Sequence, residues 1–124
     1  MLRPVQITLG TLVLCCKEPA ETFAEVSEAA FAEQKIAIQG IEMTLRSAPF
    51  GAKKMNYIML MMKDPQVHYH VIPRYLEQRI FDGVCFNDAT GPPVLDSNPE
   101  LSLHTFQKLQ QSLLGNWKTG RSKI

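Results

Sequence analysis

The stretch DPQVHYHVIPRY, residues 64–75, holds two of the three histidines of the chain within an otherwise apolar run. Successive side chains of a strand point to opposite faces, so His68 and His70 share one face while Val67 and Val71 share the other. We expect a helix to cover the Val67 face. Both histidines then lie on the opposite, more open face of a sheet.

The segment before this stretch completes a predicted β-hairpin over residues 53–75. Residues 53–63 (KKMNYIMLMMK) are mostly apolar and lie between PFGA and KDP, which is typical of a buried strand. Residues 67–75 form the second strand, and Asp64 followed by Pro65 signals a tight turn between the two.

A long amphipathic helix is predicted before the hairpin. Ser27 followed by Glu28 is typical of a helix start. Apolar residues then recur at helical spacing and form one face, which consists of Phe31, Ile38, Ile41 and Leu45. The helix is expected to end near residues 47–49 and to be roughly 30 Å long at 1.5 Å per residue, enough to cross a sheet.

The two ends of the chain complete the predicted fold. Residues 5–17 (VQITLGTLVLCCK) are typical of a strand or a bent strand pair, with Gly10 at a bulge or turn. Residues 88–99 are predicted to form a loop. At the end of this loop, Asn98 is expected to cap a helix that has Pro99 at its first position and ends at Gly115. Its apolar face is predicted to consist of Leu101, Phe106, Leu109, Leu113 and Leu114. The predicted class is therefore α+β, an antiparallel sheet with one long helix packed on it and a C-terminal helix, in a single domain over 1–124.

Composition limits the classes of partner and the compartment. The 124 residues are 45% hydrophobic and 20% charged, with a net charge of +1, so no broad attraction to nucleic acid or membranes is expected. Three cysteines, two of them adjacent, do not form a disulfide framework, and we expect a reducing compartment, the cytoplasm. No window is long enough for a membrane span, and the first residues lack a signal-peptide cleavage site.

Three interpretations of the histidine pair compete. The first is two half-buried polar side chains on an open sheet face. The second is a metal site, since His-x-His on one strand face can chelate zinc, but neither His104 nor a nearby acidic or cysteine motif supplies a third ligand, and no metal is predicted. The third is imidazole chemistry on a phosphate. A neutral imidazole is a competent nucleophile near pH 7, a second one can bind or protonate, and Arg74 or Lys63 can offset the phosphate charge.

The motif QVHYHVIPR resembles the signature of the histidine triad superfamily of nucleotide hydrolases and transferases. That pattern is His-φ-His-φ-His-φ-φ, often followed by Pro-Arg, where φ is apolar. The ending HVIPR places the third family histidine on His70, the middle one on His68 and the first on Gln66. GTLVLCCKE, from Gly10, resembles the family's earlier strand, and the long helix and KKMNYIMLMM follow in the family's order. The resemblance covers about residues 8–80, and the loop and helix of 88–115 follow that core.

The resemblance implies a nucleotide phosphohydrolase or nucleotidyltransferase. His68 would attack the α-phosphorus of a nucleoside phosphoramidate, a nucleotide ester or a dinucleoside polyphosphate, and water would hydrolyse the nucleotidyl-histidine intermediate. His70 would bind the phosphoryl oxygens or help to protonate the leaving group. The backbone carbonyl of Gln66 would orient the nucleophile, and its amide can still donate a hydrogen bond. No protein-bound cofactor is implied, and Mg²⁺ on a polyphosphate substrate is compatible with this chemistry.

Further substrate contacts are predicted from Arg74, Lys63, Asn56 and Thr11. The alternatives are an ion pair for Arg74, a solvated turn position for Lys63 and a packing role for Asn56. Thr11 stands where the family often has a further histidine, and IMLMMKDP replaces a Gly-rich segment with an Asn.

These departures, together with Gln66, favour an alternative function. The chain would then be a nucleotide-binding or interaction protein of histidine triad descent with little turnover. The family's first hairpin, which helps to hold the nucleobase, is expected to be mostly absent. The resemblance also implies a homodimer, because the family usually joins the sheets of two copies.

Overall fold

A three-stranded antiparallel sheet is central to the fold, in a computed structural model that describes residues 1–88, 91–93 and 99–117. The strand order is β1-β3-β2, with β1 at Leu12–Cys15, β2 at Lys54–Ile58 and β3 at His68–Arg74. The other elements are α1 (Glu28–Arg46), α2 (Leu103–Gly115), a 3₁₀ turn at Phe23–Glu25, and a separate hairpin of β4 (Arg79–Phe81) and β5 (Val84–Phe86). The predicted α+β class is confirmed.

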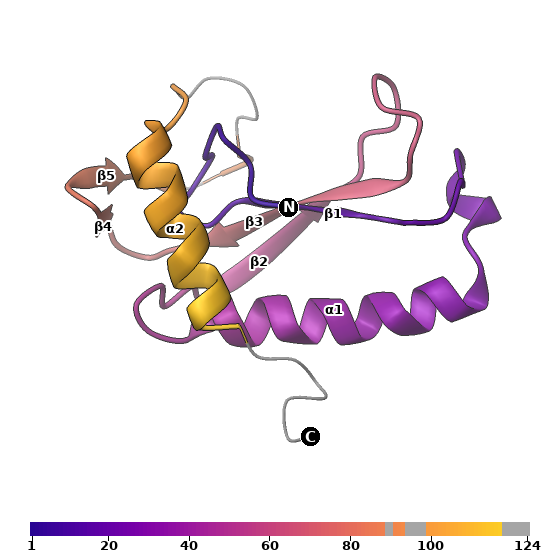
Figure 1. Ribbon diagram of the computed structural model, residues 1–124, viewed down its shortest axis with the longest axis horizontal. Coiled ribbons are helices and arrows are strands. Elements are labelled where there is room, and N and C mark those ends of the chain that lie inside the picture. The colour runs from indigo at the N-terminus through magenta and orange to yellow at the C-terminus, as the bar shows by residue number, and fades with distance from the viewer. Residues whose placement is uncertain (89–90, 94–98, 118–124) are drawn as a thin grey trace.

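Helix α1 covers one face of this sheet, as predicted (Figure 1). It begins after Ser27, whose side chain accepts a hydrogen bond from the Ala30 N–H at 3.1 Å, and it ends at Arg46. Its buried residues Ile41 and Leu45 belong to the same core cluster as Val71 of β3. That packing leaves the histidines of β3 on the face away from α1.

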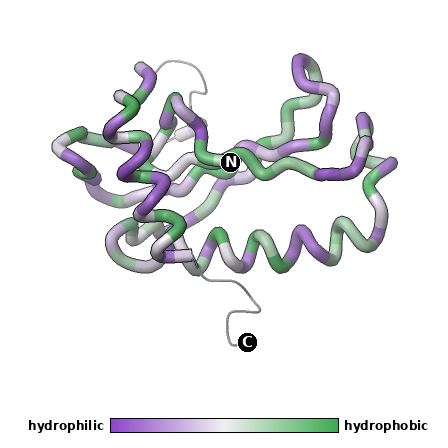
Figure 2. The backbone as a smooth tube through the Cα atoms, viewed as in Figure 1, coloured by the Kyte–Doolittle hydropathy of each residue, from purple (hydrophilic) through white to green (hydrophobic). Residues whose placement is uncertain are grey.

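Both helices carry hydrophobic and hydrophilic residues in alternation along their length (Figure 2). This pattern suits elements with one buried face. In α2 the buried side is formed by Thr105, Leu109 and Leu113. The Asn116 side chain, just after α2, donates to the Thr44 carbonyl of α1 at 2.9 Å and joins the ends of the two helices. No helix in the described residues is long and apolar enough to cross a membrane.

The predicted start of the C-terminal helix is wrong. Ser102 is the N-cap, and its side chain accepts a hydrogen bond from the Thr105 N–H at 3.2 Å. Pro99 precedes the helix, and Asn98 lies outside the described residues. The predicted end at Gly115 is confirmed. Serine is as good an N-cap as asparagine, so residue preference alone does not distinguish Ser102 from Asn98 as the start of the helix.

The central hairpin pairs as predicted, but its first strand is shorter. Strand β2 ends at Ile58, so the expected continuation to residue 63 and the tight turn at Asp64 are wrong. The chain leaves the sheet with Met62 91% exposed, and residues 59–67 form the connection. Its end is fixed to neighbouring segments, because the Val67 N–H donates to the Ala20 carbonyl at 3.3 Å.

The early segment bends where the sequence predicts. Gly10 has φ of +89°, a left-handed value that glycine adopts without a steric penalty. The Gln6 side chain holds this turn, since its Oε1 accepts from the N–H groups of Gly10 at 2.6 Å and Thr11 at 3.0 Å. Regular pairing with β3 begins at Leu12, so β1 is shorter than the predicted strand.

Candidate active site

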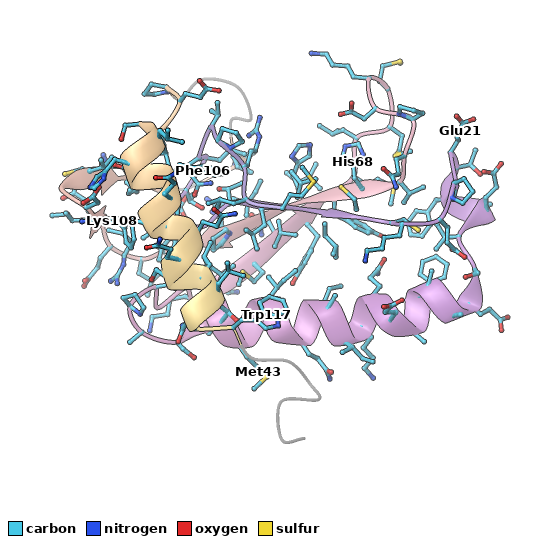
Figure 3. All side chains as sticks on the ribbon, viewed as in Figure 1. Glu21, Met43, His68, Phe106, Lys108 and Trp117 are labelled. Atoms are coloured by element: carbon cyan, nitrogen blue, oxygen red, sulfur yellow. The ribbon has the colours of Figure 1, made fainter. Side chains whose placement is uncertain are left out.

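His68 lies on the face of β3 away from α1 (Figure 3). His70, two residues later on the same strand, shares that face. His68 is only 6% exposed and His70 is partly buried. The two rings meet edge to face, with centroids 5.4 Å apart and planes at 79°. On the flanking strands, Cys15 stands opposite His68 and Ile58 opposite His70. The pair is therefore set in the middle of a sheet and not on a flexible loop.

A backbone carbonyl fixes the tautomer of His68. Its Nδ1 lies 2.8 Å from the carbonyl oxygen of Gln66, two residues earlier. A carbonyl oxygen only accepts, so Nδ1 carries the hydrogen and the lone pair of the neutral ring is on Nε2. No hydrogen bond to Nε2 is formed within the described residues. The ring thus presents a nucleophilic nitrogen in a defined direction.

The side chain of Gln66 does not point into this pair. Its amide donates a hydrogen bond to the Cys16 carbonyl at the end of β1, and the residue is exposed. Gln66 contributes to the His68 environment through its backbone oxygen. The predicted role of that carbonyl therefore has a matching geometry.

Arg74 is held by a network at the far end of the same strand face. Its Nε lies 3.0 and 2.8 Å from the two carboxylate oxygens of Asp88, and its Nη2 donates to the Gly91 carbonyl at 2.9 Å. Its Nη1 donates to Oδ1 of Asn56 at 2.7 Å. The hydrogen bond to Asp88 raises the pKa of Arg74, so the guanidinium stays charged.

A solved structure shares this arrangement of strands and helices. A hypothetical histidine triad nucleotide-binding protein from Sulfolobus tokodaii strain 7 matches 93% of this chain and 74% of its own, with a TM-score of 0.55 and 17% sequence identity. The fold is that of a histidine triad protein. No protein-family model and no curated protein matches the sequence.

Within this histidine triad fold, the predicted substrate contacts separate into two groups. His68, His70, Asn56 and Arg74 share one face of the sheet, as the strand register requires. Lys63 is exposed on the connection between β2 and β3. The structure thus gathers four of the predicted residues and leaves Lys63 outside the sheet.

Thr11 is placed away from any solvent-facing surface. It is 0% exposed, its hydroxyl donates to the Thr8 carbonyl at 2.7 Å, and it accepts from the Thr8 N–H at 3.1 Å. Those two bonds satisfy the hydroxyl inside the turn before β1. The geometry does not favour the predicted contact between Thr11 and a substrate.

Sequence reasoning missed Asp88. Besides its two contacts with Arg74, it accepts from the Tyr75 N–H at 2.8 Å. It is separated from Arg74 by 14 positions, with the β4–β5 hairpin between them, and no short-range pattern marks that pairing. Its role follows only from the tertiary structure.

The described residues do not gather a metal site around the histidines. No group of three or more His, Cys, Asp or Glu side chains in them is arranged to hold an ion. His104 lies on α2, 3.8 Å from Asp82 of the β4–β5 turn.

Proposed function

We propose that the protein is a nucleotide phosphohydrolase or nucleotidyltransferase that works through a covalent nucleotidyl-histidine intermediate on His68. The fold of a histidine triad protein supports nucleotide binding, and the observation that carries the catalytic step is the 2.8 Å contact between His68 Nδ1 and the Gln66 carbonyl. That contact leaves Nε2 as the attacking atom.

The first step exchanges one bond at phosphorus for another. His68 Nε2 forms a bond to the α-phosphorus as the bond from phosphorus to the leaving group breaks, and the leaving group takes up a proton. The ring gains positive charge, which the hydrogen bond from Nδ1 to the Gln66 carbonyl stabilises. Water then attacks the phosphorus and gives up a proton to His70 or to solvent, the N–P bond breaks, and the neutral imidazole of His68 is restored.

His70 supports the transfer from the neighbouring position. With its ring centroid 5.4 Å from that of His68, it is close enough to contact the same phosphoryl group. A histidine there can donate to a phosphoryl oxygen or protonate the leaving group. Both rings act on one phosphate without movement of the backbone, because they are two residues apart on a single strand.

A nucleotide-binding protein with little turnover is the second candidate. The burial of Thr11 and the exposure of Met62 on the connection that replaces the family's Gly-rich segment favour it. Both features remove polar groups that would hold a phosphate in place. On this alternative the histidine pair binds a nucleotide without efficient transfer.

Trapping of the intermediate separates these two functions. The protein and its His68→Asn variant are incubated with an adenosine phosphoramidate and with a dinucleoside polyphosphate, and intact mass and product release are measured. An adduct of one nucleotide monophosphate that is absent from the variant supports transfer to His68. Nucleotide binding without adduct or turnover supports the second candidate. His104→Asn is the matched control, because that side chain is 73% exposed on α2.

We further propose that the protein forms a homodimer in the cytoplasm. Strand β2 is at the edge of the three-stranded sheet and pairs only with β3 among the described strands, so a second β2 could extend the sheet. Cys15, Cys16 and Cys85 are free thiols, which suits a reducing compartment. Light scattering coupled to size exclusion tests the dimer, and a monomeric mass across micromolar concentrations would contradict it.

A further inference from the structure

The edge strand β2 carries two polar side chains, Asn56 and Lys54, on the sheet face that holds His68 and His70. Ile58 of β2 stands opposite His70, and Asn56, the next residue on the same face, stands opposite Ile72. Diagonal neighbours across two strands are about 7–8 Å apart. Asn56 is therefore one diagonal step from His70, on the side away from His68. Lys54 follows it on the same face and is exposed.

The orientation of the Asn56 amide is fixed by chemistry. A guanidinium has only donors, so the amide atom that faces Arg74 Nη1 at 2.7 Å is the oxygen. The Nδ2 group is then directed away from Arg74. It donates no hydrogen bond within the described residues, and Asn56 is only partly buried. The two N–H donors of the Asn56 amide are thus available on the sheet face that carries His68 and His70.

Arg74 is poorly suited to bind a phosphate itself. Its Nε, Nη1 and Nη2 already donate to Asp88, Asn56 and Gly91, and the carboxylate of Asp88 neutralises its charge. Its side chain is 19% exposed and that of Asp88 is 8% exposed, so water screens this pair only in part. The function that remains for the guanidinium is to hold the amide of Asn56.

We propose that Asn56 determines specificity by donating an N–H to the leaving group of the substrate, and that Arg74 is the positioning residue that orients this amide. The inference rests on the proposed transfer to His68. With His70 as the proton donor to the leaving group, the leaving group lies on the His70 side of His68, and Asn56 lies beyond His70 in the same direction. The preferred leaving groups are those with acceptor oxygens beyond the α-phosphate, above all a chain of linked phosphates.

The charge of the neighbouring residues supports this class of leaving group. Lys54 adds a positive side chain two residues from Asn56 on the same strand face, and the carboxylate of Asp88 is bound on both oxygens by Arg74. An anionic chain that passes His70 therefore meets the N–H donors of Asn56 and the exposed ammonium group of Lys54. A small neutral leaving group such as ammonia does not reach Asn56 at all.

Two substrates with the same nucleotide and different leaving groups test the inference. Initial rates give kcat and KM for adenosine phosphoramidate and for a diadenosine polyphosphate. Asn56→Ala is expected to lower kcat/KM for the polyphosphate by about tenfold to a hundredfold, because a hydrogen bond to a charged group is lost. The phosphoramidate value is expected to stay within about threefold, since ammonia makes no such contact.

Two further variants separate orientation from folding. Asn56→Asp keeps an oxygen that accepts from Arg74 but has no N–H, so it retains the network and should show the same selective loss. Arg74→Lys keeps the charge next to Asp88 but cannot hold carboxylate and amide together, and it should also lose activity on the polyphosphate alone. Gln39→Ala, an exposed position on α1, is the control.

The outcomes distinguish failure of the inference from failure of the proposed function. Equal losses on both substrates would assign Asn56 and Arg74 a general structural role and overturn the inference. So would an Asn56→Asp variant with undiminished polyphosphate turnover. If the unaltered protein turns over neither substrate and forms no adduct, the proposed function itself fails and the inference falls with it.

Discussion

The side-chain amide of Gln66 donates a hydrogen bond to the backbone carbonyl of Cys16, and so ties the end of the β2–β3 connection to β1. The backbone carbonyl of the same residue accepts from His68 Nδ1 at 2.8 Å. Gln66 therefore has two separate structural roles. Its side chain attaches the β2–β3 connection to the end of β1, and its backbone carbonyl orients the candidate nucleophile. A histidine at this position is not required for the second task.

Replacement of Gln66 by alanine tests that separation. Gln66→Ala keeps the carbonyl, so nucleotidyl-adduct formation on His68 should fall by less than about tenfold, whereas His68→Asn should abolish it. The lost side-chain hydrogen bond should cost about 0.5–1.5 kcal/mol of unfolding free energy. Intact mass and urea unfolding measure the two effects. Loss of the adduct with an unchanged unfolding curve would contradict the assignment and give the side chain a direct role.

Gly10 is predicted to be a sensitive position for stability. Its φ of +89° disfavours any side chain, and a Cβ there would lie 2.6 Å from Cδ2 of the fully buried Leu45. Gly10→Ala should therefore lower the unfolding free energy by about 1–3 kcal/mol from backbone strain, with a further loss from the overlap.

Gly83→Ala is the matched control for that prediction. Gly83 has a positive φ of +74°, but nothing lies within 4 Å of the position of an added Cβ. It should lose only the backbone part, about 1 kcal/mol. Equal losses for the two variants, measured by urea unfolding, would show that Leu45 moves aside without cost.

The sequence-based predictions succeed where a local pattern and the tertiary structure agree. Ser27 caps α1 as expected, and strand alternation places His68 and His70 on the face away from α1. A hairpin at Asp82 and Gly83 was not predicted, although both have the positive φ that a two-residue hairpin turn requires and apolar residues flank them. The Asp82-Gly83 dipeptide is thus a hairpin signal that the local sequence carries.

Other features cannot be derived from local sequence. Residues 59–62 continue the apolar composition of β2, yet the pairing of β2 with β3 stops at Ile58, opposite His70. The pairing of Asp88 with Arg74, and the orientation it gives to Asn56, depends on chain segments far apart in sequence. The histidine pair is thus predictable from its motif, whereas the network around it needs the fold.

The hydroxyl of Tyr75 is predicted to stabilise the turn before β1. Tyr75 is 8% exposed, and its hydroxyl donates to the Leu9 carbonyl at 2.7 Å. Burial raises the pKa of this phenol. Tyr75→Phe leaves a buried carbonyl without that donor, so the unfolding free energy should fall by about 1–3 kcal/mol. Thermal or urea unfolding at pH 7 measures it, and an unchanged midpoint would mean that water replaces the hydroxyl.

Asp82 is predicted to make the unfolding free energy decrease as the pH falls. Its carboxylate accepts from the Thr105 hydroxyl at 2.9 Å and from Lys108 at 3.1 Å, and these contacts hold the β4–β5 turn against α2. The hydrogen bonds from Thr105 and Lys108 lower the pKa of Asp82 below its ordinary 3.8. Folding therefore favours the charged form.

The sign of the pH dependence follows from that direction. The contribution of Asp82 is fully present above the pKa of the unfolded chain, near pH 4, and is lost as pH falls through the lower pKa of the folded state. Asp82→Asn keeps a residue that tolerates the φ of +50° and removes the charge. The difference in unfolding midpoint between protein and variant should be largest at pH 6–7 and shrink toward pH 3. A difference that stays constant between pH 7 and pH 3 would assign the effect of the substitution to turn geometry instead of charge.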